Sequence, residues 1–206
     1  MEYRIDKNKL IDILKIWDSF IRREIRLIAC GGTALTLLGI KPSTKDIDFL
    51  VPAEAEYSHL IKLLKDLGYK NESGFRWIRD DGFVFDIFRG KHIHTTEILF
   101  SPLRKGGNIC IEIGTTHIYV GALNFYDLII SKIFRGTSAD IEDSISLLKI
   151  KREQIDLKKL LLRYKKTASY DINPKRMLQN LSAFLKQVNR KIMNVDKIIK
   201  EIELWL

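Results

Sequence analysis

Apolar residues recur at helical spacing near the start of the chain. From Asp6 to about Arg23 they form one stripe, made of Leu10, Ile13, Leu14, Trp17, Phe20 and Ile21. This spacing gathers the apolar side chains on one helix face, so it predicts an amphipathic helix packed on the body of the protein. A second predicted helix runs from about Ala53 to Leu67 and ends at Gly68, a residue type that suits a helix C-terminus.

Short apolar segments around these helices predict β-strands. They are rich in β-branched and aromatic residues and are separated by Gly, Asn and Asp turn signals. The predicted strands are 26–30, 46–51, 76–80, 83–88, 108–113 and 116–120. Asp81-Gly82 predicts a hairpin between two of them. Between the first two strands, Thr33 to Gly39 predicts a short helix with Thr33 as its cap.

After about residue 121 helical spacing dominates to the end of the chain. The predicted helices are 124–134, 139–148, 156–168, 174–190 and 195–206. This order of elements predicts an α+β fold, with a core over residues 1–120 and a helical C-terminal region over residues 121–206.

The composition is that of an ordinary globular protein, with 46% hydrophobic and 30% charged residues. No apolar run approaches the roughly 20 residues that cross a bilayer, and the N-terminal residues lack the apolar core of a signal peptide. A cytoplasmic protein without membrane association is therefore expected. Cys30 and Cys110 lie far apart, each in an apolar run, which favours buried free thiols over a disulfide.

The formal net charge of +9 favours phosphate-rich partners such as NTPs or RNA. Lysines and arginines are spread through nearly every segment, so a solvated basic surface is an equal alternative. The basic run Arg163 to Lys166 could contact an RNA acceptor. Apolar stripes on the same helices, such as Leu157, Leu160, Leu161 and Tyr164, favour ordinary helix packing instead.

Two aspartates share one face of the predicted strand at residues 46–51. Because side chains alternate along a strand, Asp46 and Asp48 project together, about 7 Å apart at a rise of about 3.3 Å per residue. Two such carboxylates repel each other unless a positive charge lies nearby, and Mg²⁺ prefers carboxylate oxygens. The alternatives are two solvent-facing residues, or an Asp46 that caps the preceding turn.

Asp86 interrupts the apolar run 83–88, where its neighbours favour burial. A buried carboxylate needs an ion-pair partner or a metal ion. Arg76, Arg79 and Arg89 are the candidate ion-pair partners. If this strand lies beside residues 46–51, Asp86 completes a cluster with Asp46 and Asp48 that can hold two metal ions.

Gly31-Gly32 joins a predicted strand to a predicted helix. Backbone N–H groups at such a junction can bind phosphate, and glycine allows a close approach. Taken alone, a glycine pair is more often only a tight turn.

The combination of these features resembles the nucleotidyltransferase superfamily that includes DNA polymerase β. The signature reads Cys30-Gly31-Gly32, then residues 33–45, then Asp46-Ile47-Asp48-Phe49. Residues 30–51 look most like the AbiEii-type toxins and their uncharacterised bacterial and archaeal relatives. Residues 123–148 are similar to the later helical motif of that group, a lysine followed by acidic residues on the next helix. No resemblance is seen in the C-terminal third.

The resemblance implies a polymerase β-like core, a mixed sheet flanked by helices, and a set of site residues. Asp46 and Asp48 would bind two Mg²⁺ ions, for which Mn²⁺ could substitute, and Asp86 would bind one of them and help activate the acceptor hydroxyl.

The resemblance also implies contacts to the nucleotide. Gly31, Gly32 and Thr33 would hold the β- and γ-phosphates. Lys132 would approach the phosphates with support from Asp140 or Asp143. Relatives often carry an arginine in the turn where this chain has Pro42, and Lys41 or Lys45 is the expected replacement.

The implied reaction moves an NMP from an NTP to an acceptor hydroxyl and releases pyrophosphate. The acceptor would be tRNA, another RNA or a protein. The chain could also be a toxin that acts with an antitoxin partner. The main alternative is a catalytically inactive relative that serves as an RNA- or protein-binding module.

Overall fold

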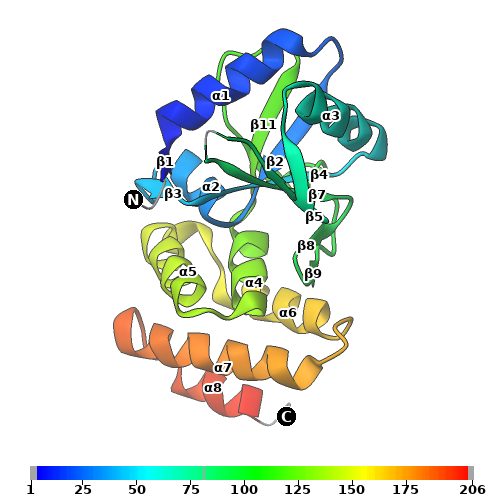
Figure 1. Ribbon diagram of the computed structural model, residues 1–206. Helices are drawn as coiled ribbons and strands as arrows, with labels where there is room; N and C mark the ends of the chain where they lie inside the picture. The colour runs from blue at the N-terminus through cyan, green and yellow to red at the C-terminus, as the bar shows by residue number, and fades with distance from the viewer. Residues whose placement is uncertain (1–3, 81, 204–206) are drawn as a thin grey trace. The chain divides into compact units, whose positions relative to one another are not determined.

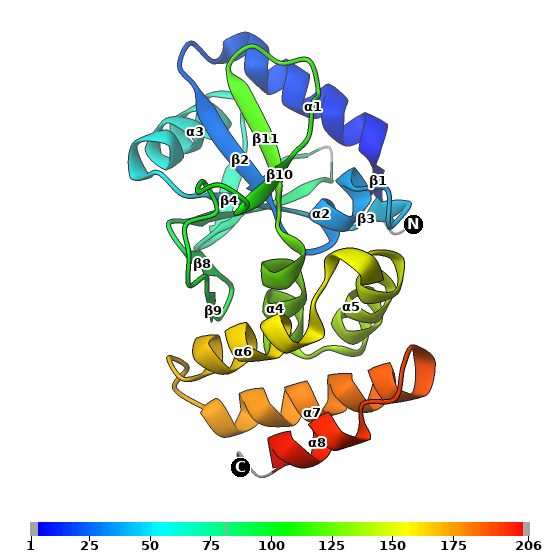
Figure 2. The same cartoon turned by 180° about the vertical axis from the view of Figure 1, so that it is seen from behind.

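A seven-stranded mixed sheet forms the centre of the first part of the chain in the computed structural model, which describes residues 4–80 and 82–203. Internal contacts divide the chain into two units. The first comprises Met1–Ile93 and Ile98–Asn124, and the second comprises His94–Glu97 and Phe125–Leu206. Figures 1 and 2 show the elements of each unit from opposite sides.

The strand order of the sheet is β10-β11-β2-β4-β7-β6-β5. The pairs β11–β2 and β4–β7 are parallel, and the other neighbours are antiparallel. The strands are β2 (Ile25–Ala29), β4 (Asp46–Val51), β5 (Lys70–Ser73), β6 (Arg76–Ile78), β7 (Val84–Arg89), β10 (Asn108–Cys110) and β11 (Ile118–Leu123). The shorter strands of this unit are β1 (Ile5–Asp6), β3 (Ser43–Thr44) and β8 (His92–Ile93).

Three helices belong to the same unit: α1 (Lys7–Phe20), α2 (Gly31–Leu37) and α3 (Glu54–Asp66). Asp6 caps α1 by accepting a hydrogen bond from the Lys9 N–H. Trp17 of α1 packs on Phe85 of β7, with ring centroids 4.8 Å apart. Because Phe85 and Asp86 point to opposite faces of the sheet, α1 covers the face away from Asp86.

Some local expectations for this unit are wrong. Helix α2 begins at Gly31, with Cys30 at the N-cap position and no side-chain capping hydrogen bond, so Thr33 lies inside the helix and is not its cap. Cys110 is exposed, because the expected strand 108–113 is only the short edge strand β10. Cys30 is buried, and neither cysteine forms a disulfide. β6 and β7 pair antiparallel as the hairpin signal indicates, although Asp81 lies outside the described residues.

The second unit consists mainly of helices. Its elements are β9 (Thr96–Glu97), α4 (Phe125–Arg135), α5 (Ser138–Ile150), a 3₁₀ turn η1 (Arg152–Gln154), α6 (Leu157–Ala168), α7 (Pro174–Lys191) and α8 (Asp196–Glu203). Residues 204–206 of the last expected helix lie outside the described part of the chain. Tyr164 of α6 is fully buried, and its ring lies against Phe134 of α4 with centroids 5.1 Å apart. The apolar stripes of α6 and α7 thus pack inside this unit, as their spacing indicates.

Among the described residues, no helix has both the length and the apolar content that crossing a membrane requires.

Candidate active site

The Gly31-Gly32 turn lies directly against β4. Gly31 has a φ of +55°, and a Cβ added there would lie 2.2 Å from Oδ2 of Asp48. A Cβ on Gly32 would lie 2.5 Å from the hydroxyl of Thr44. The two glycines therefore allow the start of α2 to approach the aspartate strand more closely than any side chain would permit.

Thr33 and Thr44 fix the backbone of β4 beneath the aspartates. The Asp48 N–H donates a hydrogen bond to the Thr33 hydroxyl at 2.8 Å. The Thr33 hydroxyl in turn donates to the Asp46 carbonyl oxygen at 3.3 Å. Thr44 donates to the same carbonyl oxygen at 2.9 Å. Both threonines are buried. The Thr33 side chain therefore orients Asp48.

Asp48 and Asp86 are brought together by the parallel pairing of β4 and β7. They are direct partners in the register, so their side chains project from the same face of the sheet. A carboxylate oxygen of each lies within 4.8 Å of the other. Asp48 is 6% exposed and Asp86 is 2% exposed. Two carboxylates this close and this buried require positive charge beside them.

Asp46 begins β4 and is exposed, and Lys45 immediately before it is exposed as well. Asp46 lies on the same face of β4 as Asp48, as the alternation of side chains predicts. It is thus placed at the solvent side of the buried pair.

Arg76 of β6 supplies one positive charge. Its Nε donates to Oδ1 of Asp86 at 3.0 Å, and its Nη2 donates to Oδ2 at 3.2 Å. The hydrogen bonds to Asp86 raise the pKa of Arg76 above its ordinary value, and nearby Asp46 and Glu72 add to the effect. Of the candidate partners of Asp86, Arg76 makes this pair, whereas Arg89 pairs with Glu54.

The donor atoms of this cluster fit a divalent cation. Mg²⁺ and Mn²⁺ prefer hard oxygen ligands, and Asp48 and Asp86 offer such oxygens side by side in a region that excludes most solvent. A cation would also relieve the repulsion between the two carboxylates.

Lys132 of α4 lies in a cluster of charged side chains within the second unit. Its side chain is 2% exposed, and its Nζ lies 2.7 Å from Asp143 and 3.4 Å from Asp140, both on α5. Asp140 also pairs with Arg135. Burial alone would raise the pKa of Asp140, but hydrogen bonds from Arg135 and Thr137 outweigh it and lower this pKa below its ordinary value. Lys132 is therefore not the exposed helical lysine that its sequence position alone would suggest.

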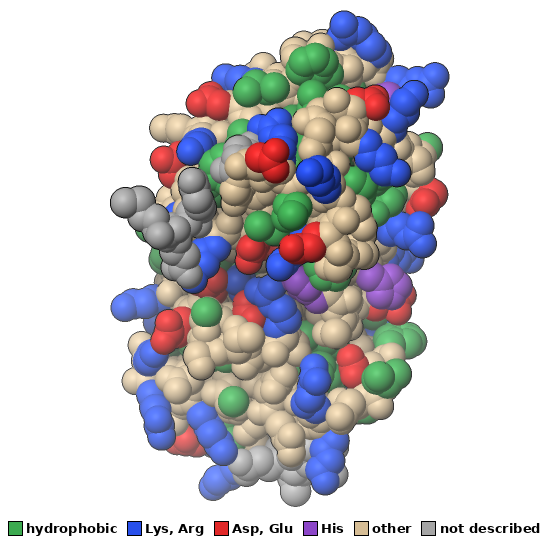
Figure 3. Space-filling view, viewed as in Figure 1, with side chains coloured by type: hydrophobic (Ala, Val, Ile, Leu, Met, Phe, Trp, Pro, Cys, Tyr) green, Lys and Arg blue, Asp and Glu red, His purple; other side chains and the backbone are tan. Residues whose placement is uncertain are grey.

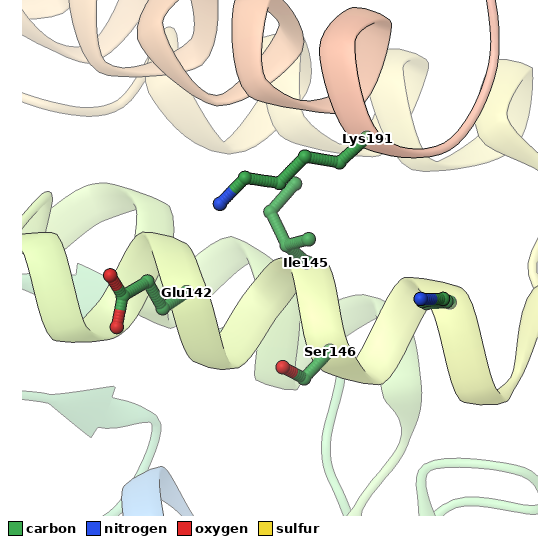
Figure 4. A pocket seen from close by; sticks show the side chains of 5 residues that line it. Glu142, Ile145, Ser146 and Lys191 are labelled. Atoms are coloured by element: carbon green, nitrogen blue, oxygen red, sulfur yellow. The ribbon is translucent and has the colours of Figure 1, made fainter.

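The second unit also contains a groove between α5 and α7. It has a volume of about 450 Å³ and is lined by Glu142, Ile145, Ser146, Lys149 and Lys191. Figure 4 shows Lys191 extending from α7 toward Ile145 of α5. The groove contains none of the candidate carboxylates, so the chemistry points to the β4–β7 pair instead.

Basic side chains are scattered over the face seen in Figure 3 and do not gather in one block. The distribution agrees with the even spread of lysine and arginine along the sequence.

Comparison with known proteins places this geometry in context. The crystal structure of ANT(2'')-Ia in complex with adenylyl-2''-tobramycin matches with a TM-score of 0.53 at 17% identity, over 79% of this chain and 98% of that chain. The solution structure of ANT(2'')-Ia also gives 0.53, at 18% identity, over 79% and 93% of the two chains. A family model described as "Nucleotidyltransferase of unknown function (DUF6036)" matches residues 105–193. The chain has the same fold as these nucleotidyltransferases.

This fold confirms the α+β class with a mixed sheet and a helical C-terminal part. The family match over residues 105–193 agrees with the nucleotidyltransferase resemblance. The family match runs to residue 193 and so extends into the C-terminal third, where the sequence shows none of the motifs that carry the resemblance. A weaker match, with a TM-score of 0.45 at 17% identity over 89% and 95% of the two chains, is to an antigenic nucleotidyltransferase-like protein from Paracoccidioides brasiliensis. No curated protein matches the chain.

Sequence reasoning missed Thr44 as a component of this candidate site. Its buried hydroxyl supports the Asp46 carbonyl and lies against Gly32. Its position two residues before Asp46, in a turn next to a strand, was a usable signal, because Ser and Thr side chains often bond nearby backbone groups in turns.

Proposed function

We propose that the protein is a metal-dependent nucleotidyltransferase, which moves an NMP from an NTP to an acceptor hydroxyl and releases pyrophosphate. The observation that carries the proposal is the in-register pair Asp48 and Asp86, two buried carboxylates with oxygens within 4.8 Å, joined to the close Gly31–Asp48 contact. The nucleotidyltransferase fold supports this interpretation of the pair.

The three aspartates have different roles in the proposed reaction. Asp46 and Asp48 would hold two Mg²⁺ or Mn²⁺ ions, and Asp86 would hold one of them. Bound divalent ions lower the pKa of the attacking hydroxyl and offset charge on the leaving group. Asp86, beside the attacking oxygen, would help to remove its proton. The acceptor oxygen forms a bond to the α-phosphorus, and the bond from that phosphorus to the pyrophosphate oxygen breaks.

The remaining site residues would position the nucleotide. Gly31, Gly32 and the backbone of Thr33 would contact the β- and γ-phosphates, since the glycines leave room for a close approach. Lys45 and Lys132 would contribute positive charge to the phosphates. In this proposal residues 1–120 form the catalytic core and residues 121–206 the helical domain.

The acceptor proposed from the net charge of +9 is an RNA such as tRNA, with a protein hydroxyl as the second choice. The ANT(2'')-Ia complex contains adenylyl-2''-tobramycin, so a small hydroxylated molecule is a further acceptor to test.

The decisive experiment is a label-transfer assay on the full-length chain with Mg²⁺ and each labelled NTP. Total tRNA, candidate proteins and an aminoglycoside serve as separate acceptors. Asp48→Asn keeps the size of the side chain but removes its charge, and we expect it to lower transfer about 10²-fold or more. Asp12→Asn, an exposed change of the same kind on α1, should leave transfer unchanged.

The contrary result is equally specific. An absence of transfer with every acceptor, together with salt-sensitive RNA binding that survives Asp48→Asn, would support the inactive RNA-binding relative instead.

The resemblance to AbiEii-type proteins supports a toxin role for the same chemistry, with a separate antitoxin as partner. Induced expression of the wild-type chain should then arrest growth, and expression of Asp48→Asn should not. Arrest by both chains would remove this role from the proposal.

A further inference from the structure

Arg76 extends the row of charged residues across the sheet. It is the direct partner of Asp86 in the antiparallel β6–β7 pair, just as Asp48 is the partner of Asp86 in the β4–β7 pair. Directly paired residues project from the same face of a sheet. Asp48, Asp86 and Arg76 therefore lie side by side on three successive strands.

The guanidinium of Arg76 engages both carboxylate oxygens of Asp86, at 3.0 and 3.2 Å. Two parallel bonds of this kind give arginine a defined geometry that a lysine cannot reproduce. Arg76 therefore occupies the same two carboxylate oxygens that Asp86 would offer to a cation.

The two partners differ in their access to solvent. The Asp86 side chain is 2% exposed, whereas the Arg76 side chain is 36% exposed. Asp86 is thus fixed in the sheet, while Arg76 reaches it from the solvent side. If one partner leaves the pair, it is Arg76, because its charge can return to water at little cost.

A divalent ion and the guanidinium would compete for Asp86. Both are positive, and at an effective dielectric constant of about 20 two such charges a few ångströms apart repel each other strongly. We propose that Arg76 is a built-in competitor of the metal: it neutralises Asp86 while no divalent ion is bound, and it releases one or both oxygens when the ion enters. This inference rests on the proposed metal site at Asp48 and Asp86.

Arg76 is a positioning residue in this scheme, and its effect is to set the concentration of divalent ion at which the site fills. Removing the charge of Arg76 is expected to strengthen metal binding, although it lowers the stability of the metal-free protein. A purely structural ion pair would have the opposite signature, since its loss would only disorder the site.

The test is Mn²⁺ binding to the full-length protein at constant pH and ionic strength. Binding is measured by calorimetry and by the electron paramagnetic resonance signal of free Mn²⁺. We expect Arg76→Gln to bind Mn²⁺ about tenfold more tightly than the wild type. Arg76→Lys, which keeps the charge without the paired bonds, should fall between the two. Arg89→Gln removes an equal charge at the end of β7, where Arg89 pairs with Glu54 instead, and should leave the affinity unchanged.

Thermal unfolding gives a second measurement. The metal-free Arg76→Gln variant should melt below the wild type, and saturating Mn²⁺ should raise its melting temperature by more than it raises that of the wild type.

The wild-type chain can decide the question even if Arg76→Gln does not fold. The Nε–H of Arg76 donates to Asp86, so its ¹H–¹⁵N signal, assigned by its loss in Arg76→Lys, should shift during a Mg²⁺ titration with the same midpoint as binding. An unchanged Arg76 signal through saturation would overturn the inference, as would an Arg76→Gln affinity equal to or weaker than that of the wild type.

Failure of the proposed function looks different. If the wild-type chain binds no Mn²⁺, or if its binding survives Asp48→Asn, then the metal site itself is wrong and the inference falls with it. Binding that requires Asp48 but ignores Arg76 leaves the proposed function intact and removes only the competition.

Discussion

At the scale of single residues, the position of the Asp48 carboxylate requires a glycine at residue 31. The backbone of Gly31 has a positive φ, and the space where its Cβ would lie is filled by the Asp48 carboxylate. A side chain at this position would meet both a conformational cost and a steric one. Gly39 allows the two costs to be measured separately. It also has a positive φ, +71°, but nothing lies within 4 Å of an added Cβ, so a side chain there meets only the conformational cost.

Gly31→Ala should therefore destabilise the protein more than Gly39→Ala. Both changes carry the backbone cost of about 1–2 kcal/mol. Gly31→Ala should add about 1–3 kcal/mol, because Asp48 or the start of α2 must move. Urea unfolding gives both losses in free energy of unfolding, and equal losses would contradict the close contact. Only Gly31→Ala should also weaken Mn²⁺ binding.

In the second unit, Lys132 is a buried cation whose Nζ contacts Asp140 and Asp143. Lys132→Met should lower the free energy of unfolding by about 3 kcal/mol, because it removes the cation from a buried ion pair. Lys149→Met, an exposed change on α5, should have an effect below about 0.5 kcal/mol.

A double-mutant cycle identifies the partner. Lys132→Met combined with Asp143→Asn should cost clearly less than the sum of the two single changes, as measured by guanidinium unfolding. Strictly additive losses would contradict a direct energetic link between the two side chains.

At the scale of elements, Asp18 joins the last turn of α1 to the start of β11. Its carboxylate accepts the backbone N–H groups of Thr116, His117 and Ile118 at 2.8–2.9 Å. Partial burial alone would raise the pKa of Asp18, but these hydrogen bonds outweigh it and hold the pKa below its ordinary value of 3.8. The ionised form of Asp18 therefore stabilises the attachment of the helix to the strand.

Asp18→Asn should lower the free energy of unfolding by about 1–2 kcal/mol at neutral pH, since the side chain is partly exposed. The pKa of Asp18 is depressed in the folded state, so its stabilising effect is complete above the unfolded value of 3.8 and is lost as the pH falls through the lower folded value. Urea unfolding of both proteins from neutral pH downward should show the difference shrinking below pH 3.8.

Asp12→Asn on the same helix is the matched control and should behave as the wild type throughout. A difference for Asp18→Asn that stays constant through the acid range would show that its hydrogen bonds do not depend on charge.

At the scale of the whole molecule, local patterns predicted the fold class because each unit contains one dominant kind of pattern. Short apolar segments such as 83–88 became strands, and helical stripes such as those of 156–168 became packed helices. The sequence placed Asp86 beside Asp48 only on the condition that their two strands are neighbours. The order of strands in a sheet cannot be predicted from the residues of any one strand.

The errors and omissions have related causes. Cys110 lies in an apolar run but at the edge of the sheet, where one side has no neighbouring strand to bury it. The choice of Arg76 over Arg79 and Arg89 depends on the register between β6 and β7, and a shift of one residue would point it to the other face. Lys132 is buried through helix packing, which the spacing of its own helix does not reveal.

The parallel pairing of β4 and β7 has a consequence for how the protein folds. The intervening segment, with α3, β5 and β6, must close before Asp48 meets Asp86, so this contact joins distant parts of the chain. Loop closure of this kind slows folding. It also brings two negative charges together at the moment of closure, so the rate of refolding becomes sensitive to the ionic strength of the solution.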